Sequence, residues 1–230
     1  MTGTEQLTID VPGTSTVAAT LTAPRKPRVL FVMAHGAGAG MGHPFMETVA
    51  DGLSERGVAT LRYQFPYMQT GSKRPDRPAV AYTAVRSAVE TAAHLLPRIP
   101  IVAGGKSFGA RMTTQAQAER PLSGVIGLAA FGFPLHAAGK PSEERARHLA
   151  KVSIPMLFIQ GDRDALAGTE LLVPAIQRLG GLATLRILKG ADHSFHVLAR
   201  SGRTNAQVMS EALDAMAIWL TGLLSTSSVR

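Results

Sequence analysis

The pattern of apolar and polar residues changes about twenty residues into the chain. Residues 7–11 and 16–21 alternate apolar and polar side chains, and Pro12-Gly13-Thr14-Ser15 joins them. Alternation with a period of two on both sides of a turn is typical of a β-hairpin. After it, short apolar runs recur, each followed by a segment with helical spacing. We therefore expect an antiparallel hairpin that leads into alternating strands and helices.

Continuous apolar runs are typical of strands that are buried on both faces, as in parallel sheets covered by helices. The runs predict strands at residues 28–34, 58–63, 99–103, 124–130, 155–160 and 183–188. The intervening patterns predict helices at residues 44–57, 78–96, 107–119, 168–179 and 205–224. In the last helix, core packing explains the spacing of Met209, Leu213, Met216 and Leu220 better than cofactor contact. The fold class is therefore α/β, a mostly parallel sheet with helices on both faces.

Length and composition favour one domain spanning residues 1–230. The chain is 45% hydrophobic and can bury roughly 70% of its unfolded surface in one core. It has no cysteine, which excludes disulfides, thiolate metal sites and cysteine nucleophiles. Its first six residues do not resemble a signal peptide, and no apolar run approaches the roughly 18 residues that span a bilayer. We expect a cytoplasmic protein with no membrane partner.

The formal net charge of +8 comes mostly from arginines scattered along the chain. Aromatic residues make up only 5%, which argues against a stacking platform for bases and hence against a nucleic-acid partner. A solvated basic surface is the favoured interpretation. Residues 73–77, Lys-Arg-Pro-Asp-Arg, follow a predicted strand and have an alternative interpretation, attraction of an anionic substrate.

The segment Gly105-Lys106-Ser107-Phe108-Gly109 lies between a predicted strand and a predicted helix. A G-x-S-x-G in this setting is typical of a nucleophile elbow, in which a tight turn exposes the serine hydroxyl. The turn strains the serine backbone, and a side chain at either flanking glycine would collide with neighbouring chain. The pentapeptide predicts that Ser107 is a nucleophile.

Partners for Ser107 follow in the order carboxylate, then histidine. Gly161-Asp162-Arg163-Asp164 comes after one predicted strand, and Lys189 to Phe195, which contains His193, comes after the next. Side chains at the carboxyl ends of parallel strands converge at one edge of a sheet. We expect His193 to be the base and either Asp162 or Asp164 to orient it.

A glycine-rich loop, His35-Gly36-Ala37-Gly38-Ala39-Gly40, follows the first parallel strand. Such a loop supplies one backbone N–H of an oxyanion hole, and the residue after the nucleophile supplies the other. These donors would be Ala37 and Phe108. The glycines do not fit a P-loop or a dinucleotide fingerprint, because Pro100 and Met41 stand where glycine is required.

Other polar residues near these motifs have structural interpretations. His35 and His43 are expected to brace the glycine loop and not to bind a metal, and His196 to have a packed or surface role. Asp192 is expected to bond its local backbone, and Arg111 to tie its helix to an adjacent loop. Lys106 either carries a solvated charge, diverging from Ser107, or holds an anionic acyl group.

The chain resembles the α/β-hydrolase superfamily on its dienelactone-hydrolase-like side, over residues 28–222. It is most similar to a family of small capless members named after a testis-expressed protein. The motifs that carry the likeness are His35-Gly36-Ala37-Gly38-Ala39, Phe65-Pro66-Tyr67-Met68, Gly104-Gly105-Lys106-Ser107, Pro134-Leu135-His136 and Gly190-Ala191-Asp192-His193-Ser194-Phe195.

The resemblance implies a three-layer α/β-hydrolase fold with a minimal cap or none. Its G-x-x-D pattern favours Asp164 over Asp162 as the acid, with Asp162 bonding turn backbone. Phe133 stands where relatives carry a tyrosine, and we expect Lys106, Phe133 and His35 to contact substrate.

Together these residues predict a serine hydrolase that needs no cofactor and no metal. It would act on a carboxylic ester or related acyl bond of a small molecule through an acyl-enzyme on Ser107. Two alternatives remain open: a binding or scaffold protein that keeps the fold without turnover, and an acyltransferase that uses the same residues.

Overall fold

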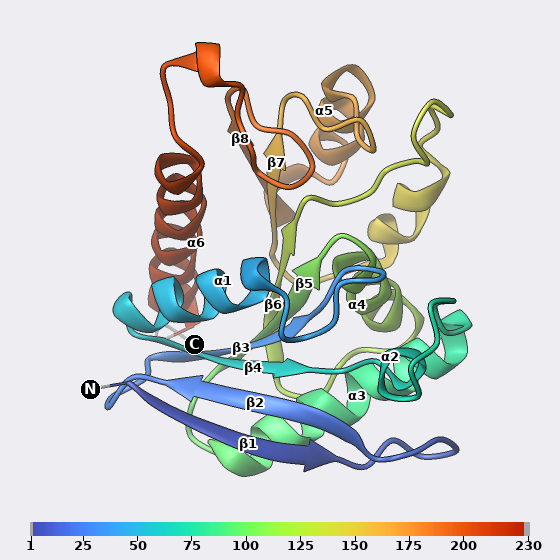
Figure 1. Ribbon diagram of the computed structural model, residues 1–230, viewed down its shortest axis with the longest axis vertical. Helices are drawn as coiled ribbons and strands as arrows, with labels where there is room; N and C mark the ends of the chain where they lie inside the picture. Colours follow the sequence, from blue (N-terminus) through green and yellow to red (C-terminus); the bar gives the residue numbers. More distant parts are fainter. Residues whose placement is uncertain (1, 228–230) are drawn as a thin grey trace.

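Within residues 2–227, which this computed structural model describes, the strands form one eight-stranded sheet (Figure 1). Its strand order is β1-β2-β4-β3-β5-β6-β7-β8. The strands are β1 (Gly3–Ile9), β2 (Val17–Ala23), β3 (Val29–Ala34), β4 (Val58–Tyr63), β5 (Ile101–Lys106), β6 (Val125–Phe131), β7 (Met156–Gly161) and β8 (Ala183–Leu188). Every predicted strand is present, with ends shifted by a few residues.

The strand directions match the predicted architecture. β1 and β2 pair as an antiparallel hairpin, and β2 also runs antiparallel to β4. All the remaining neighbours, from β4 to β8, are parallel. The carboxyl ends of β3, β5, β7 and β8 therefore meet at one edge of the sheet, where the glycine loop, Ser107, Asp164 and His193 follow.

Helices connect the strands as predicted. They are α1 (Pro44–Glu55), α2 (Pro66–Gln69), α3 (Pro78–Leu95), α4 (Phe108–Glu119), α5 (Thr169–Gln177) and α6 (Asn205–Ser227). Short 3₁₀ turns are η1 (Glu144–Lys151), η2 (Gly180–Leu182) and η3 (Ala199–Ser201). The four-residue α2 was not predicted, because it is too short to show helical periodicity.

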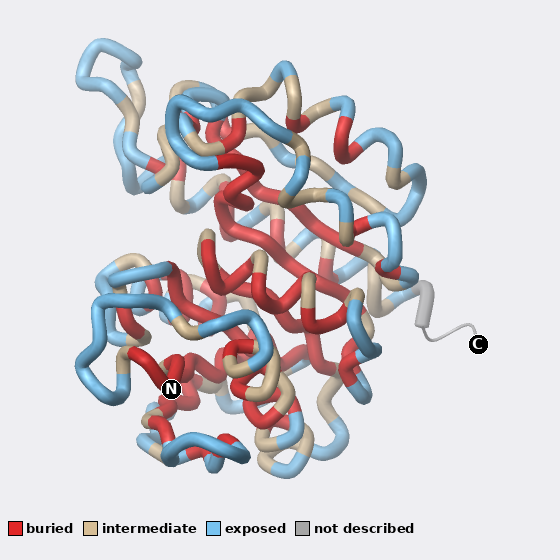
Figure 2. Tube along the Cα trace, turned by 90° about the vertical axis from the view of Figure 1, so that its right-hand side faces the viewer, coloured by how far each residue is buried: buried red, intermediate tan, exposed pale blue. Residues whose placement is uncertain are grey.

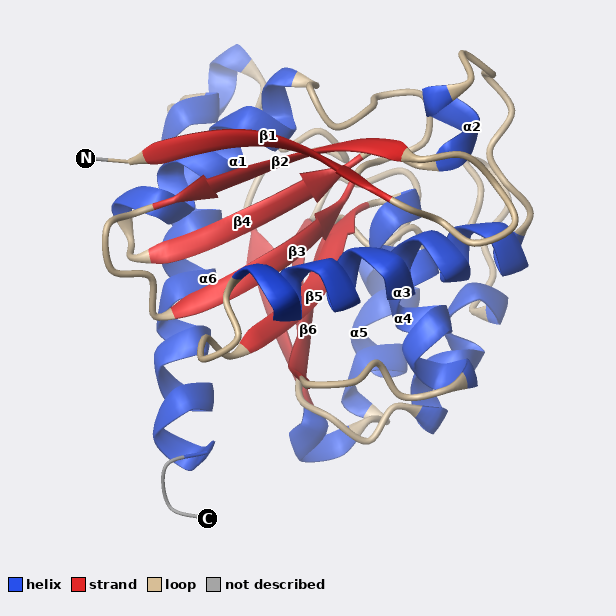
Figure 3. Cartoon of the chain, turned by 90° about the horizontal axis from the view of Figure 1, so that it is seen from below, coloured by secondary structure: helices blue, strands red, loops and turns tan. Residues whose placement is uncertain are grey.

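Alternate side chains of the parallel strands feed two separate cores. In β3, Leu30 and Val32 pack with residues of α3, α4 and α5, whereas Phe31 and Met33 pack with α1 and α6. Figures 1 and 3 show these two groups of helices on opposite faces of the sheet. Figure 2 shows the buried chain running through the middle, with exposed loops at the rim. This is the predicted three-layer arrangement.

Helix α6 packs its apolar face on the sheet. Leu213, Met216 and Leu220 are buried with Phe31 and Leu157, as core packing predicts, whereas Met209 is only partly buried. Within residues 2–227, α6 is also the helix that is long and apolar enough to cross a membrane by length and composition, with a mean hydropathy of 1.2. A core helix of a soluble protein meets the same criterion.

The segment between β6 and β7 forms no separate cap domain. Its regular structure is the 3₁₀ segment η1. His148 of η1 lies against α4, where its Nε2 atom is 2.8 Å from the Thr114 hydroxyl. The segment therefore packs beside the elbow helix.

Candidate active site

The turn between β5 and α4 places Ser107 at the carboxyl edge of the sheet. Its backbone has φ 50° and ψ −111°, a conformation that L residues rarely adopt. A β-carbon at Gly105 would lie 2.1 Å from the Ala34 carbonyl oxygen, and one at Gly109 would lie 2.4 Å from the same atom. Glycine at both positions lets the turn pack directly against β3, as the motif predicts.

Ser107, His193 and Asp164 form a hydrogen-bonded chain. His193 Nε2 lies 2.9 Å from Ser107 Oγ, and His193 Nδ1 lies 2.7 Å from Asp164 Oδ2. Each residue leaves a different strand: β5, β7 or β8. The Asp164 side chain has no exposed surface, whereas 26% of the His193 side chain is exposed. The imidazole is thus accessible on one side and held by a buried carboxylate on the other.

The Asp164 carboxylate is fixed by three donors in all. Besides His193, the backbone N–H of Leu166 donates to Oδ1 at 2.8 Å, and the side-chain amide of Gln160 donates to Oδ2. Gln160 lies on β7 and is fully buried. Sequence reasoning missed this residue; its polarity within an apolar strand was the available signal. Hydrogen bonds to the charged form stabilise a buried carboxylate.

The other two aspartates bond backbone. Asp162 Oδ1 accepts from the N–H of Gly190 at 2.7 Å, and Asp192 Oδ1 accepts from the N–H groups of Ser194 and His196 at 2.8 and 2.9 Å. Neither Asp162 nor Asp192 is hydrogen-bonded to the His193 ring among the described residues. These are the turn contacts that the sequence predicts.

The acid loop and the histidine loop are joined closely. A β-carbon on Gly161 would lie 2.2 Å from the Ala191 carbonyl oxygen, so the two loops touch through backbone atoms. Arg163 N–H donates to the same carbonyl at 2.9 Å, and Asp162 N–H donates to Leu188 at 3.3 Å. The relative position of carboxylate and imidazole is therefore set by backbone contacts.

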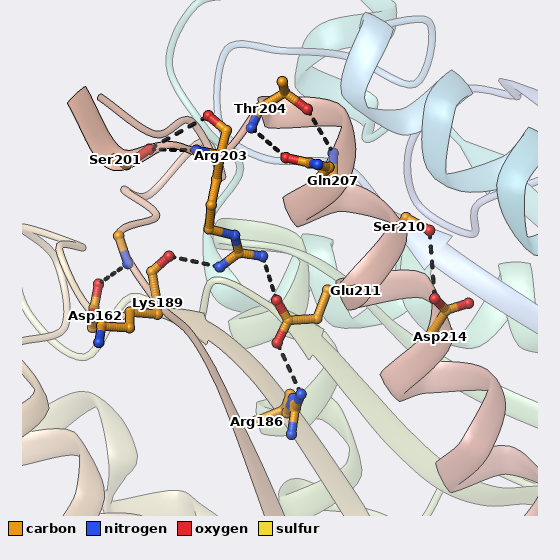
Figure 4. A network of polar contacts seen from close by, with 11 residues as sticks. Asp162, Arg186, Lys189, Ser201, Arg203, Thr204, Gln207, Ser210, Glu211 and Asp214 are labelled. Carbon is orange, nitrogen blue, oxygen red and sulfur yellow. Dashed lines mark hydrogen bonds and ion pairs between the residues drawn. The ribbon is translucent and has the colours of Figure 1, made fainter. Parts of the chain in front are cut away.

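A polar network anchors the histidine loop to α6 and β8. The Arg203 guanidinium donates to the Lys189 carbonyl oxygen at 2.9 Å and also bonds Glu211 of α6 (Figure 4). Glu211 accepts a second bond from Arg186 of β8, at 2.9 Å. These contacts fix the start of the loop that carries His193.

Lys106 is partly buried between Ser107 and the histidine loop. Its ammonium donates to the His193 carbonyl oxygen at 2.5 Å and lies 5.5 and 5.3 Å from the ring centres of Phe45 and Phe195. Burial lowers the pKa of Lys106 to about 8, although the nearby carboxylates of Asp164 and Asp192 oppose the shift. The interpretation of Lys106 as a solvated charge is therefore wrong.

His35 supports the glycine loop through hydrogen bonds of its ring. Its Nδ1 atom lies 2.8 Å from the Gly36 carbonyl oxygen, and its Nε2 atom accepts from the N–H of Phe65 at 3.0 Å. Burial lowers the pKa of His35 to about 4, so the ring is neutral at pH 7 and carries its proton on Nδ1. Two more side chains bond this loop. The Tyr67 hydroxyl accepts a hydrogen bond from the N–H of Gly38 at 3.2 Å, and the Gln64 side chain accepts one from the N–H of Met41 at 2.8 Å.

The backbone N–H groups of Ala37 and Phe108 have no hydrogen-bond acceptor among the described residues. Phe108 is the first residue of α4, where N–H groups lack an acceptor within the helix. Ala37 and Ser107 both line the main cavity. Two free donors thus flank the serine that the elbow exposes.

The main cavity has a volume of about 810 Å³ and opens onto Ser107 and His193. Apolar side chains from α1, α6 and the histidine loop form much of its wall, among them Phe45, Met46 and Met209. A second cavity of about 350 Å³ lies beyond Ser107 and includes Arg111 and Arg145. Ala37, Ser107 and Leu166 line both cavities, so the hydroxyl stands at their boundary.

Two of the predicted substrate contacts are wrong. His35 and Phe133 are fully buried, and neither lines either cavity. Both ring nitrogens of His35 form hydrogen bonds with backbone atoms. Phe133 packs edge-on against Phe158 in the core, at 5.7 Å between ring centres. Lys106 does line the main cavity, so its contact with substrate stays a prediction.

The other polar residues near the site cap a helix or lie at the rims of the cavities. His43 caps α1, with its Nδ1 accepting from the N–H of Phe45 at 3.1 Å. His196 is exposed at the rim of the main cavity. In the basic segment 73–77, Lys73, Arg74 and Arg77 are exposed, and Asp76 lines the second cavity. Among the described residues, no group of three or more histidines, aspartates and glutamates could hold a metal ion.

Comparison with known proteins identifies the family. Residues 27–221 match the family described as the alpha/beta hydrolase domain. The chain belongs to the α/β-hydrolase family. The predicted α/β-hydrolase fold is thus confirmed, and so is the expectation of dienelactone-hydrolase-like structural relatives.

Solved α/β-hydrolase structures share this fold at low sequence identity. An alpha-beta serine hydrolase homologue from Coxiella burnetii is 21% identical, with a TM-score of 0.74 over 92% of this chain and 96% of that one. A dienelactone hydrolase from Anabaena variabilis is 20% identical, with a TM-score of 0.73 over 93% and 96%. A serine hydrolase without lid from Xanthomonas campestris is 21% identical, with a TM-score of 0.75 over 94% of each chain.

Proposed function

We propose that this α/β-hydrolase is a serine hydrolase that cleaves a carboxylic ester or related acyl bond of a small molecule. The observation that carries the proposal is the hydrogen-bonded chain from Ser107 Oγ through His193 to the buried Asp164. An isolated serine hydroxyl is a poor nucleophile, and an adjacent imidazole activates it by accepting its proton. The Asp164 carboxylate orients the ring and stabilises the imidazolium that forms.

The reaction proceeds in two steps, acylation and deacylation. Ser107 Oγ attacks the ester carbonyl carbon while its proton passes to His193 Nε2. The oxyanion accepts from the N–H groups of Ala37 and Phe108, and His193 then gives the proton to the departing alcohol, leaving an acyl-enzyme. Water attacks the acyl group by the same route, which releases the acid and restores Ser107.

Membership of the small capless family named after a testis-expressed protein is a further part of this proposal. It is supported by the sequence motifs at residues 35–39, 104–107 and 190–195, and by the segment 132–155, which forms no separate cap domain.

A fluorophosphonate probe tests the function directly. We expect the probe to modify Ser107 in the wild-type protein and not in Ser107→Ala, with loss of nitrophenyl-ester turnover in the variant. Ser194→Ala is the matched control, since Ser194 lines the same cavity without contacting His193 through its hydroxyl among the described residues. A wild-type protein that forms no adduct at Ser107 would favour the binding or scaffold alternative.

A further inference from the structure

Arg111 stands one helical turn beyond Ser107, and its side chain forms no hydrogen bond with the described residues. Its backbone N–H donates to the Ser107 carbonyl oxygen at 3.1 Å, which closes the first turn of α4. Its Nε atom is buried without a hydrogen-bond acceptor, and no ion pair of Arg111 is found within residues 2–227. The sequence predicts that Arg111 ties α4 to a neighbouring loop. That prediction is wrong, since its contact is with the Phe108 ring, 6.0 Å from the guanidinium carbon.

A buried guanidinium nitrogen without a hydrogen-bond acceptor is unusual. Arginine carries five N–H donors in a planar fork and remains charged inside proteins. Burial of such donors costs free energy unless acceptors replace the lost water. The side chain of Arg111 therefore lies in a place where an acceptor from outside the chain would stabilise it.

Arg145 supplies a second positive charge to the same cavity. It lies on η1, is partly buried, and has no ion pair among the described residues. Both side chains line this cavity, and the pKa of Arg111 is lowered first by burial and then by the charge of Arg145. Two like charges facing one cavity repel each other, and an anion between them removes the repulsion.

The carboxylate that lines this cavity, Asp76, does not neutralise the pair. Its Oδ2 atom accepts from the N–H of Tyr67 at 3.0 Å, and it forms no ion pair with Arg111 or Arg145. Burial raises the pKa of Asp76, and the hydrogen bond from Tyr67 opposes that shift. With two arginines and one aspartate, the lining carries an excess of positive charge.

The position of this cavity ties it to the chemistry at Ser107. Its remaining lining is mostly apolar, with Pro75, Pro78, Phe108, Met112, Pro134 and Leu166. Ser107 and Ala37 belong to both cavities, so a substrate with its carbonyl at Ser107 can extend into each. One helical turn separates Ser107 from Arg111, a rise of about 6 Å along α4. An anionic group a short spacer away from the carbonyl would reach the guanidinium.

We propose that the second cavity binds a carboxylate of the substrate through Arg111 and Arg145 while the ester carbonyl lies at Ser107. The inference rests on the proposed serine hydrolase function and names its substrate class: small esters with a carboxylate on one side of the scissile bond. The planar fork of arginine suits a carboxylate, which accepts two parallel N–H bonds. The larger, apolar cavity takes the uncharged part of the substrate.

Matched neutral and anionic esters test the assignment. Mono(4-nitrophenyl) glutarate carries the carboxylate on the acyl side and is compared with 4-nitrophenyl butyrate. 4-Acetoxybenzoate carries it on the alcohol side and is compared with phenyl acetate. We expect the wild-type protein to prefer the anionic member of one pair by about tenfold or more in kcat/KM, as a charged hydrogen bond warrants. The pair in which the anionic ester is preferred shows whether the substrate carboxylate lies on the acyl side or the alcohol side of the scissile bond.

Arginine variants locate the source of that preference. We expect Arg111→Gln to lower the anionic-to-neutral ratio of kcat/KM about tenfold, and Arg145→Gln to lower it less. Arg147→Gln is the control. It removes one positive charge from η1, the segment that carries Arg145, but Arg147 is exposed and ion-paired with Glu144 at 2.9 Å. Equal ratios in Arg111→Gln and Arg147→Gln would overturn the proposal.

A binding measurement separates this inference from the proposed function. We expect calorimetry to show saturable binding of glutarate to Ser107→Ala protein, lost when Arg111→Gln is added and retained when Arg147→Gln is added. Absence of binding to Ser107→Ala overturns the carboxylate site even if esters are hydrolysed. Conversely, glutarate binding by a protein that neither turns over esters nor reacts with the fluorophosphonate supports the site and removes the hydrolase function.

Discussion

The ammonium of Lys106 donates a 2.5 Å hydrogen bond to the backbone carbonyl oxygen of His193. Lys106 directly precedes Ser107, so this contact joins the strand that carries the serine to the loop that carries the imidazole. The rings of Phe45 and Phe195 lie beside the ammonium and limit its access to water. Lys106 is thus a positioning residue for the proposed base.

Replacement of Lys106 by methionine keeps the apolar stem and removes the donor. We expect kcat for a neutral nitrophenyl ester to fall roughly tenfold with little change in KM, because small misplacements of catalytic groups slow turnover strongly. Lys189→Met, which removes an exposed ammonium, is the control. Equal kcat values in the two variants would show that Lys106 does not position His193.

Lys106 also makes stability depend on pH. Its pKa is 10.5 in an unfolded chain and about 8 in the folded protein, so the folded state releases the proton first. Below pH 8 the folded protein bears the cost of the buried charge, and that cost disappears as the pH rises from 8 to 10.5. We expect the free energy of unfolding of wild type, measured by urea and relative to Lys106→Met, to increase over that interval.

The two aspartates of the acid loop are predicted to differ sharply. Asp164→Asn removes the acceptor that holds His193 Nδ1, and we expect turnover to fall on the order of 10²-fold or more. Asn at position 162 can still accept from the Gly190 N–H, so Asp162→Asn is expected to stay near wild type. Initial rates with one nitrophenyl ester compare the variants, and the reverse ranking would assign the acid role to Asp162.

The elbow glycines are predicted to be structurally essential. Alanine at Gly105 would place its β-carbon 2.1 Å from the Ala34 carbonyl oxygen, at a backbone φ of 152°. We expect Gly105→Ala to lower the free energy of unfolding by roughly 3 kcal/mol or more, because β3 and β5 cannot move apart without losing the hydrogen bonds that pair them. Gly181→Ala is the control, because nothing lies within 4 Å of its β-carbon. Urea unfolding measures both.

Protonation of His35 is predicted to destabilise the protein in acid. Its pKa is 6.5 in an unfolded chain and about 4 in the folded one, where Nε2 must stay unprotonated to accept from Phe65. The stability that neutral His35 supplies is therefore complete above pH 6.5 and lost as the pH falls to 4. We expect the difference in free energy of unfolding between wild type and His35→Gln to shrink over that range. A constant difference would contradict this account.

Sequence patterns predicted the strands, the long helices and the order of the site residues. Apolar runs such as residues 155–160 are local features, and the elbow motif reports a local backbone constraint at Ser107. Both are readable without coordinates, because the cause and the effect lie within a few residues.

Contacts between distant loops were harder to predict. One interpretation of Lys106 was a solvated charge that diverges from Ser107, yet its amine reaches the backbone of a loop 87 residues away in sequence. Gln160 and His35 support the site from the interior, where only the packing of separate strands decides what each side chain meets. Burial of Phe133 likewise depends on its contact with Phe158 of β7, which no local pattern reveals.

The contact of Gly161 with the Ala191 carbonyl has a mechanical consequence. Since backbone bonds also join the two loops, Asp164 and His193 belong to one unit, which meets Ser107 and its strand through the imidazole–hydroxyl bond and the Lys106 bond to the His193 carbonyl oxygen. A side chain at 161 would split that unit, although it would never meet a substrate.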